Sequence, residues 1–202
     1  MCGFVGYVND TPDKSVNEKI IKDMADRIRH RGPDQDDYYV DSSVSLGFRR
    51  LSIIDLDGGS QPILNEDGTK VLVFNGEIYN YQPIREELIK KGHVFRTKTD
   101  SEVLLHGYEE YGCELLNKLR GMFAFVIWDS TEKKLFGARD IFGIKPFFYY
   151  LKNGNFLFGS EIKSFLSNPL FEKELNEERL PDYLCFEYIP TTETMFKNVY
   201  KM

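Results

Sequence analysis

Cys2 follows Met1 directly and precedes a glycine and a short apolar stretch, GFVGYV. Because cysteine is small, methionine aminopeptidase normally removes a preceding methionine, which would leave Cys2 as the first residue with a free α-amine. A terminal amine titrates at about pH 8 and can take the thiol proton near neutral pH. The sequence therefore predicts a nucleophile that carries its own general base. The simpler interpretation is a small buried residue at position 2.

Further along the chain stand residue types that a thiol needs for acyl transfer on an amino acid. The side-chain amide of Asn75 and the backbone N–H of Gly76 are two donors suited to a tetrahedral oxyanion. The guanidinium of Arg50 suits a free α-carboxylate, and the carboxylate of Asp100 suits an α-ammonium group. Each also has a structural interpretation: a tight turn at Asn75-Gly76, a solvated charge at Arg50 and a helix cap at Asp100. Together they favour the catalytic interpretation.

The composition is that of one soluble globular domain of 202 residues with a net charge of −6. No apolar run approaches the roughly 20 residues of a membrane span, and no signal peptide is recognisable, so we expect a cytoplasmic protein without a membrane partner. The basic residues are scattered, which argues against binding of nucleic acid. Widely spaced Cys2, Cys113 and Cys185 indicate reduced thiols and form no metal-binding pair, so no metal site is expected.

Strand-like runs alternate with helical segments, and short turns between the runs predict antiparallel hairpins at 41–43, 129–133 and 152–155. Three helices are expected, over 15–30, from Pro83 to Gly92 and from Asp100 to Gly112. Each has one apolar stripe and must therefore pack on a sheet. This pattern predicts an α+β layered fold.

The first predicted helix has the clearest local signals. Ser15 and Glu18 have the spacing of a capping box at its beginning. Apolar residues recur at helical spacing and are expected to form its buried stripe, namely Val16, Ile20, Met24 and Ile28.

A series of motifs occurs in a fixed order: MCGFVGYV, RHRGPD, RRLSIID, NGEIYN, TDSEV, GMFAFVIWD, ARDIFGIKP and SEIKSF. In this order they resemble the class II glutamine amidotransferases, and most closely the N-terminal glutaminase domain of glutamine-hydrolysing asparagine synthetases of the B type. The resemblance covers nearly the whole chain. It implies an N-terminal-nucleophile (Ntn) hydrolase fold, a four-layer αββα sandwich with two antiparallel sheets between helices.

The resemblance also implies the reaction and its catalytic residues. Cys2 would attack the side-chain amide of L-glutamine, release ammonia and form a thioester that water hydrolyses to L-glutamate. Its own α-amine would be the general base, and Asn75 and Gly76 would form the oxyanion hole. The loop 31–34 would lie near the nucleophile and help to close the pocket. The histidines are expected to be structural or surface residues, namely His30, His93 and His106.

Substrate binding is implied at Arg50, Ile53, Ile54, Glu77 and Asp100. Arg50 would bind the glutamine carboxylate, with backbone contacts from Ile53 and Ile54 beside it. Glu77 and Asp100 would bind the amino end of glutamine. Arg49 is the competitor for the carboxylate, but it stands one position before the arginine of the family motif.

The chain is predicted to be a single glutamine amidotransferase type 2 domain over 1–202, whose last part, about 175–202, leads toward a synthetase domain. In full synthetases of this family that second domain adenylates aspartate, and its SGG-x-DS loop is not in this sequence. ATP and magnesium are expected only there, so no cofactor is expected in this domain. The expected partners are L-glutamine and a C-terminal asparagine synthetase domain, and a homodimer stays open.

Two alternatives remain open from the sequence. The same glutamine chemistry could serve another acceptor, such as a sugar or a peptide-like metabolite. The chain could also be a glutamine-binding module that has lost catalysis, although the full set of candidate site residues argues against this.

Overall fold

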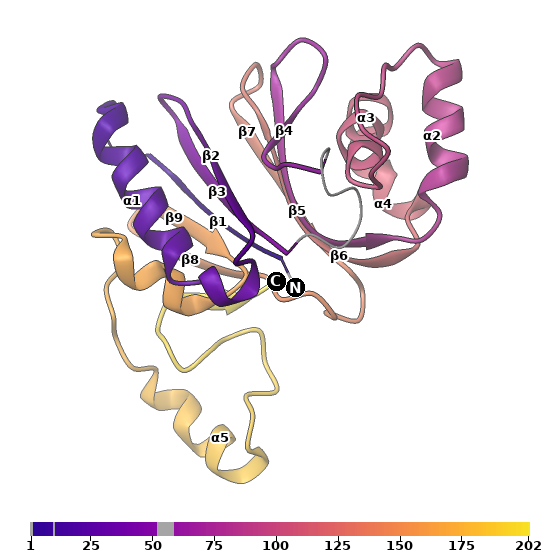
Figure 1. Cartoon of the computed structure of the whole chain (residues 1–202). Coiled ribbons are helices and arrows are strands. Elements are labelled where there is room, and N and C mark those ends of the chain that lie inside the picture. The colour runs from indigo at the N-terminus through magenta and orange to yellow at the C-terminus, as the bar shows by residue number, and fades with distance from the viewer. Residues whose placement is uncertain (1, 10, 52–58) are drawn as a thin grey trace.

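The computed structural model describes residues 2–9, 11–51 and 59–202. Two antiparallel sheets face each other, with helices on their outer sides (Figure 1). The first sheet has six strands in the order β10-β8-β9-β1-β3-β2, and the second has four in the order β4-β5-β6-β7. The strands of the first are β1 (Gly3–Val8), β2 (Gln35–Val40), β3 (Val44–Arg50), β8 (Phe148–Lys152), β9 (Asn155–Gly159) and β10 (Val199–Lys201). Those of the second are β4 (Ile63–Leu64), β5 (Lys70–Ile78), β6 (Gly121–Asp129) and β7 (Lys134–Arg139).

The helices cover the two outer faces. The six-stranded sheet is covered by α1 (Lys14–Asp26) and the 3₁₀ helix η3 (Ile162–Ser167). The four-stranded sheet is covered by α2 (Tyr81–Lys90), α3 (Glu102–Tyr111) and α4 (Leu115–Lys118). The remaining helices are short, namely η1 (Arg29–Arg31), η2 (Gly112–Glu114), η4 (Glu177–Arg179) and α5 (Leu180–Phe186).

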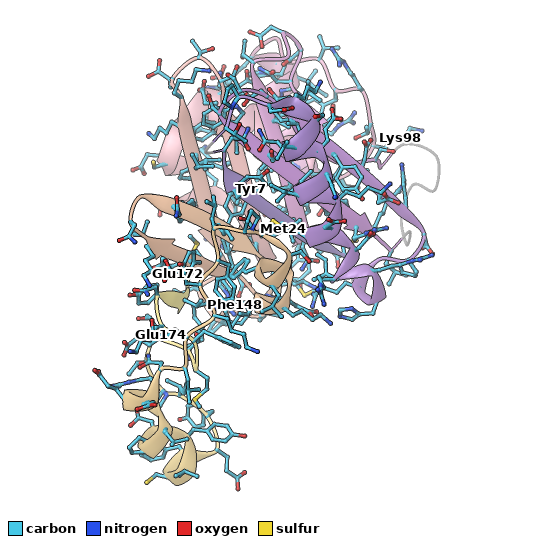
Figure 2. The ribbon with its side chains drawn as sticks, turned by 90° about the vertical axis from the view of Figure 1, so that its left-hand side faces the viewer. Tyr7, Met24, Lys98, Phe148, Glu172 and Glu174 are labelled. Atoms are coloured by element: carbon cyan, nitrogen blue, oxygen red, sulfur yellow. The ribbon has the colours of Figure 1, made fainter. Side chains whose placement is uncertain are left out.

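Alternation of side chains along each strand builds separate cores in the spaces between the layers. On β5, Val71 and Val73 face the other sheet, where they meet Phe4 and Phe48. The intervening Leu72 faces the opposite way and joins the core under α2 and α3. A third core lies between the six-stranded sheet and α1, and Figure 2 labels two of its members, Tyr7 and Met24. The predicted αββα sandwich is therefore confirmed.

The predicted hairpins at 41–43, 129–133 and 152–155 are also confirmed, joining β2 to β3, β6 to β7 and β8 to β9. Each turn contains the expected chemistry. Asp41 accepts hydrogen bonds from the N–H groups of Ser43 and Val44, whereas Asn153 and Gly154 adopt positive φ angles of 53° and 82°.

The details of α1 differ from the prediction. Its N-cap is Asp13, whose carboxylate accepts from the N–H groups of Ser15 and Val16 at 3.0 and 3.4 Å. The helix begins earlier than the Ser15–Glu18 spacing indicated, because the carboxylate of Asp13 accepts the N–H groups that a capping Ser15 would leave inside the helix. Val16 is 43% exposed, so it is not part of the buried stripe, and Ile21 is buried instead.

The structural interpretations of Asn75-Gly76 and Asp100 are wrong. Asn75 and Gly76 lie inside β5, opposite Ala124 and Phe123 of β6, and not in a turn. A Cβ on Gly76 would lie 2.3 Å from the carbonyl oxygen of Met122, so the close approach of the two strands requires glycine there. The third helix begins two residues after Asp100, at Glu102.

The segment after residue 175 leaves the sandwich and returns to it. It carries α5, which projects below the sandwich in Figures 1 and 2, and it ends in β10, which pairs with β8. Apolar side chains on and beside α5 are exposed, notably Leu184 and Tyr188. Among the described helices, none is long and apolar enough to cross a membrane.

Candidate active site

The site forms at one end of the sandwich, where β1 and β3 of the six-stranded sheet approach β5 of the four-stranded sheet. Gly3 of β1 pairs with Arg49 of β3, so the preceding Cys2 comes beside the following Arg50. Phe4 and Phe48 face the inter-sheet core, and Cys2 and Arg50 continue the same faces of β1 and β3 by the two-residue alternation. From the other sheet, Asn75 continues the inner face of β5.

A cavity of about 320 Å³ opens at this end, a size suited to a small-molecule ligand. Of the residues that the sequence predicts for the site, its walls include Cys2, Arg50, Gly76, Glu77 and Asp100. Asn75 is not among the lining residues but stands directly before Gly76 on β5. Ile53 and Ile54 fall within 52–58 and lie outside the described residues.

Cys2 is held by contacts on its sulfur and on its backbone. The N–H of Leu51 points to the sulfur at 3.4 Å, and the sulfur lies 3.6 Å from the Leu51 carbonyl oxygen. The Arg31 Nε–H donates to the Cys2 carbonyl oxygen at 2.9 Å. As predicted, the loop that begins at Arg31 therefore adjoins the candidate nucleophile.

Arg31 is itself anchored by Glu161, which precedes η3. Its Nη1 lies 2.9 Å from Glu161 Oε1, and His30 and Lys163 contact the same carboxylate at 2.9 and 3.2 Å. Burial alone would raise the pKa of Glu161, but the hydrogen bonds from Arg31, His30 and Lys163 outweigh it and lower the pKa. Glu161 is therefore a stable anion that fixes the arginine against Cys2. The sequence motifs SEIKSF and RHRGPD gave no reason to place these residues together.

The two adjacent arginines point in opposite directions. Arg50 lines the cavity, and its Nη1 donates to the side chain of Gln35 at 3.2 Å. Arg49 points to the helical side of the sheet, where it forms ion pairs with Asp26 of α1 and, at 3.1 Å, with Asp36 of β2. This placement results from the strand alternation, which turns neighbouring residues to opposite faces.

Asn75 has an unsatisfied buried amide. It is 2% exposed, and its Nδ2 has no hydrogen-bond partner among the described residues. A buried donor without a partner costs roughly 1 to 3 kcal/mol. A bound oxyanion would satisfy it.

Asp100 is fixed to the end of β5. The N–H of Ile78 donates to its Oδ2 at 2.7 Å. Burial raises the pKa of Asp100, the Ile78 hydrogen bond lowers it, and the charge of Glu77 raises it again, with a net upward shift. The site therefore holds two carboxylates close together, and a bound cation would relieve their repulsion.

Gln61 is a cavity residue that the sequence analysis missed. Its side-chain amide pairs with the backbone of Phe74 in both directions, accepting from the N–H at 2.6 Å and donating to the carbonyl oxygen at 3.1 Å. The side chain of Gln61 thus takes the place of a neighbouring strand at Phe74, the residue before Asn75. These bonds hold Gly59 and Gln61 in the cavity wall. No local sequence pattern signals this role, because it depends on a distant strand edge.

The two facing sheets, the outer helices and the cysteine before the first inner strand define the N-terminal-nucleophile class. Solved structures share this fold. The glutamine phosphoribosylpyrophosphate amidotransferase from B. subtilis, complexed with ADP and GMP, matches with a TM-score of 0.67 at 19% identity, over 86% of this chain and 45% of that one. The allosteric regulatory enzyme of purine biosynthesis matches with a TM-score of 0.62 at 20% identity, over 82% of this chain and 43% of that one. At such identities the likeness shows the fold alone.

A family model described as a glutamine amidotransferase domain matches residues 1–202, and the chain belongs to this family. The chain is 48% identical over 206 residues to the glutamine-hydrolysing asparagine synthetase 1 of Bacillus subtilis, covering 100% of the chain and 32% of that protein. It is 41% identical over 165 residues to the glutamine-hydrolysing asparagine synthetase 2 of Arabidopsis thaliana, covering 81% of the chain and 28% of that protein. The chain thus spans about a third of the length of these relatives.

Proposed function

We propose that this domain hydrolyses L-glutamine to L-glutamate and ammonia, with Cys2 as nucleophile. The observation that carries the proposal is the buried amide of Asn75, whose Nδ2 has no partner in the described part of the chain, beside a cavity whose walls include Cys2, Arg50 and Asp100. Around this cavity, Cys2 offers a nucleophile, Arg50 a cation for the substrate carboxylate and Asp100 an anion for the substrate ammonium group. The amide of Asn75 adds a hydrogen-bond donor beside them.

The proposed first half-reaction forms a thioester. The free α-amine of Cys2 takes the thiol proton, and the sulfur attacks the side-chain carbonyl carbon of glutamine, forming the C–S bond. The negative charge that develops on the amide oxygen is stabilised by Asn75 Nδ2–H and the N–H of Gly76. The protonated amine then gives its proton to the leaving nitrogen, the C–N bond breaks and ammonia departs.

The second half-reaction restores the thiol. The α-amine of Cys2 takes a proton from water, which attacks the thioester carbon. The C–S bond breaks, the sulfur is reprotonated and glutamate leaves. In both halves Arg50 holds the substrate carboxylate and Asp100, with Glu77, holds its ammonium group, while Ile53 and Ile54 offer backbone contacts. Because every step uses groups of the chain and water, we propose no cofactor for this reaction.

We further propose that the ammonia serves a C-terminal synthetase domain that uses ATP and magnesium to amidate aspartate, since the similar proteins from B. subtilis and Arabidopsis carry the name asparagine synthetase and are about three times as long. The loop after β7 supports a further domain contact: Ile141 and Phe142 are 93% and 86% exposed at its tip. A catalytic thiol must stay reduced, so we assign the reaction to the cytoplasm.

The proposal is tested with Met1-processed protein and L-glutamine, by measuring glutamate, ammonia and asparagine in one assay. We expect glutamate and ammonia in equal amounts, and no asparagine when ATP, magnesium and aspartate are added. Arg50→Ala should raise KM about 10- to 100-fold, because it removes a charge-assisted hydrogen bond to the substrate carboxylate.

Arg49→Ala is the matched control for Arg50→Ala. It breaks the ion pairs with Asp26 and Asp36 and should lower the melting temperature while leaving KM within about threefold. A strong KM effect for Arg49→Ala without one for Arg50→Ala would contradict the proposed clamp. No glutamate at all from processed protein would contradict the proposed activity.

Asp100→Asn should separate substrate binding from stability. It replaces the charge that faces the glutamine ammonium, so KM should rise about 10- to 100-fold. Because folding raises the pKa of Asp100, the protonated carboxyl stabilises the folded state at pH values below the pKa of the unfolded chain. This stabilisation is lost as the pH rises through the pKa of the folded state. At neutral pH the uncharged asparagine, which can still accept from Ile78, should therefore give a melting temperature no lower than that of the parent.

Kinetics and thermal melts at pH 7 measure both effects. Asp37→Asn, which changes an exposed carboxylate on β2, is the control. A lowered melting temperature together with an unchanged KM would show that Asp100 has a structural role only.

A further inference from the structure

Two histidines and two glutamates converge on the outer side of the four-stranded sheet, apart from the glutamine cavity. Glu66 comes from the turn between β4 and β5, His93 from the segment after α2, and His106 and Glu109 from α3. One ligand atom from each lies within 4.8 Å of the others. The sequence analysis expected no metal, because the cysteines form no metal-binding pair and the histidines were assigned structural or surface roles. The four residues come from separate segments and form no local motif that would have signalled the cluster.

The spacing of these atoms is close to that of a tetrahedral site. His93 Nδ1 lies 3.3 Å from Glu66 Oε1 and 3.9 Å from Glu109 Oε2. His106 Nδ1 lies 3.3 Å from Glu66 Oε2 and 3.2 Å from Glu109 Oε2. A tetrahedral Zn²⁺ with bonds of about 2.0 to 2.2 Å places its ligand atoms about 3.3 to 3.5 Å apart. Glu66 now faces His93 with Oε1 and His106 with Oε2, so its carboxylate would have to turn until a single oxygen reaches the ion between them.

His93 has an outer carboxylate on its second nitrogen, as metal-binding histidines usually do, whereas the nearest described carboxylate to the second nitrogen of His106 lies beyond hydrogen-bond distance. His93 Nε2 lies 3.2 Å from Glu110 Oε1, which leaves Nδ1 to face the cluster. The buried His106 has its Nε2 3.9 Å from Glu102 Oε1. Glu102 is itself fixed by the N–H groups of Arg96 and Thr97, at 2.9 and 2.7 Å.

The glutamates are fixed as well. Asn65 Nδ2 donates to Glu109 Oε1 at 2.7 Å, leaving Oε2 toward the histidines. The N–H of Val94 donates to Glu66 Oε1 at 3.1 Å. The ligand atoms are therefore held in place by an outer shell of hydrogen bonds, which reduces the entropy that binding would cost.

We propose that Glu66, His93, His106 and Glu109 bind one Zn²⁺ ion. Two imidazole nitrogens and two carboxylate oxygens suit this ion, whereas Mg²⁺ and Ca²⁺ prefer six or more oxygen ligands. The ion would join α3 to the β4–β5 turn and to the segment after α2. That segment continues into Lys98, Thr99 and Asp100 of the glutamine cavity, so the site stabilises the structure behind the cavity wall.

The competing explanation is an ion-pair network without metal. Burial alone would lower the pKa of His106, but the neighbouring carboxylates of Glu102, Glu109 and Glu66 raise it to about 9. A charged imidazole would then neutralise the glutamates in place of the ion. The two explanations differ in whether the cluster takes up zinc with defined stoichiometry.

The test is a calorimetric titration of the chelator-treated full chain with Zn²⁺ at pH 7.5. We expect one equivalent to bind with a Kd below about 1 μM, and a hundredfold excess over Kd to raise the melting temperature by about 5 °C or more. His93→Gln and Glu109→Gln should each weaken binding at least about 100-fold. His30→Gln, which changes a histidine outside the cluster, should leave it unchanged.

Cobalt absorption separates this cluster from the cysteines. One equivalent of Co²⁺ should give the visible bands of a tetrahedral nitrogen and oxygen site without a thiolate charge-transfer band. The absence of stoichiometric zinc binding, a thiolate band, or zinc binding that survives both cluster variants would overturn the proposal. Because the readouts are binding and melting temperature, the outcome is independent of glutaminase activity.

Discussion

Replacing Cys2 with alanine is expected to lower glutamate release from L-glutamine by about 10⁴-fold or more, because no thioester can then form. The fold should remain, since the sulfur has only marginal contacts, with the backbone of Leu51 and the edge of the inter-sheet core. Glutamate assays and thermal melts measure the two effects. Cys113→Ser, which changes an exposed thiol, is the control and should retain full activity.

The same mechanism requires removal of Met1, because an amide nitrogen on Cys2 cannot act as a base. Intact-mass spectrometry of an active sample should therefore show the mass of the chain without methionine. Full activity in a sample that retains Met1, or unimpaired activity of Cys2→Ala, would identify a different nucleophile or base.

Asn75→Ala is expected to lower kcat by roughly 10² to 10³ with a smaller effect on KM, because the lost donor binds the charge that develops only in the transition state. The effect on stability should be modest. Truncation leaves a small void, but it also removes a buried Nδ2 that has no partner among the described residues. Steady-state kinetics and thermal melts check both expectations.

Asn75→Asp sharpens this test, because a carboxylate has nearly the same shape but no donor and would repel the oxyanion. Its kcat should fall at least as far as that of Asn75→Ala. A kcat within about threefold of the parent for either variant would exclude Asn75 from the oxyanion hole and leave its unsatisfied amide without an explanation.

Local signals in the sequence were sufficient to predict an α+β layered fold, whereas the four-layer arrangement was implied by the resemblance to the family. The two-residue alternation in β5 and β6 assigns one face to the inter-sheet core and the other to the helices, and turn residues such as Asp41 and Gly154 define the hairpins. The ordered motifs also placed the chain in its family before the structure was known. The alternation and the turn residues predict structure correctly because they depend only on residues a few positions apart in the chain.

Local signals failed where a distant partner determines the conformation. Asn75-Gly76 has the sequence of a turn, yet pairing with β6 extends β5 through it to Ile78. Asp100 stands where a helix cap could be, yet its carboxylate bonds to the end of β5. In both cases contacts across the fold outweigh a local preference that is worth about 1 kcal/mol.

The sequence by itself determined which residue types are available: a thiol near the chain start, an amide, arginines and carboxylates. Only the tertiary structure decided which of them meet. The register of β1 and β3 turned Arg50 toward the cavity and Arg49 toward α1, and the packing of α3 brought His106 and Glu109 to Glu66. The physical reason is that strand register and helix packing are set by burial of whole apolar faces, which no short segment specifies alone.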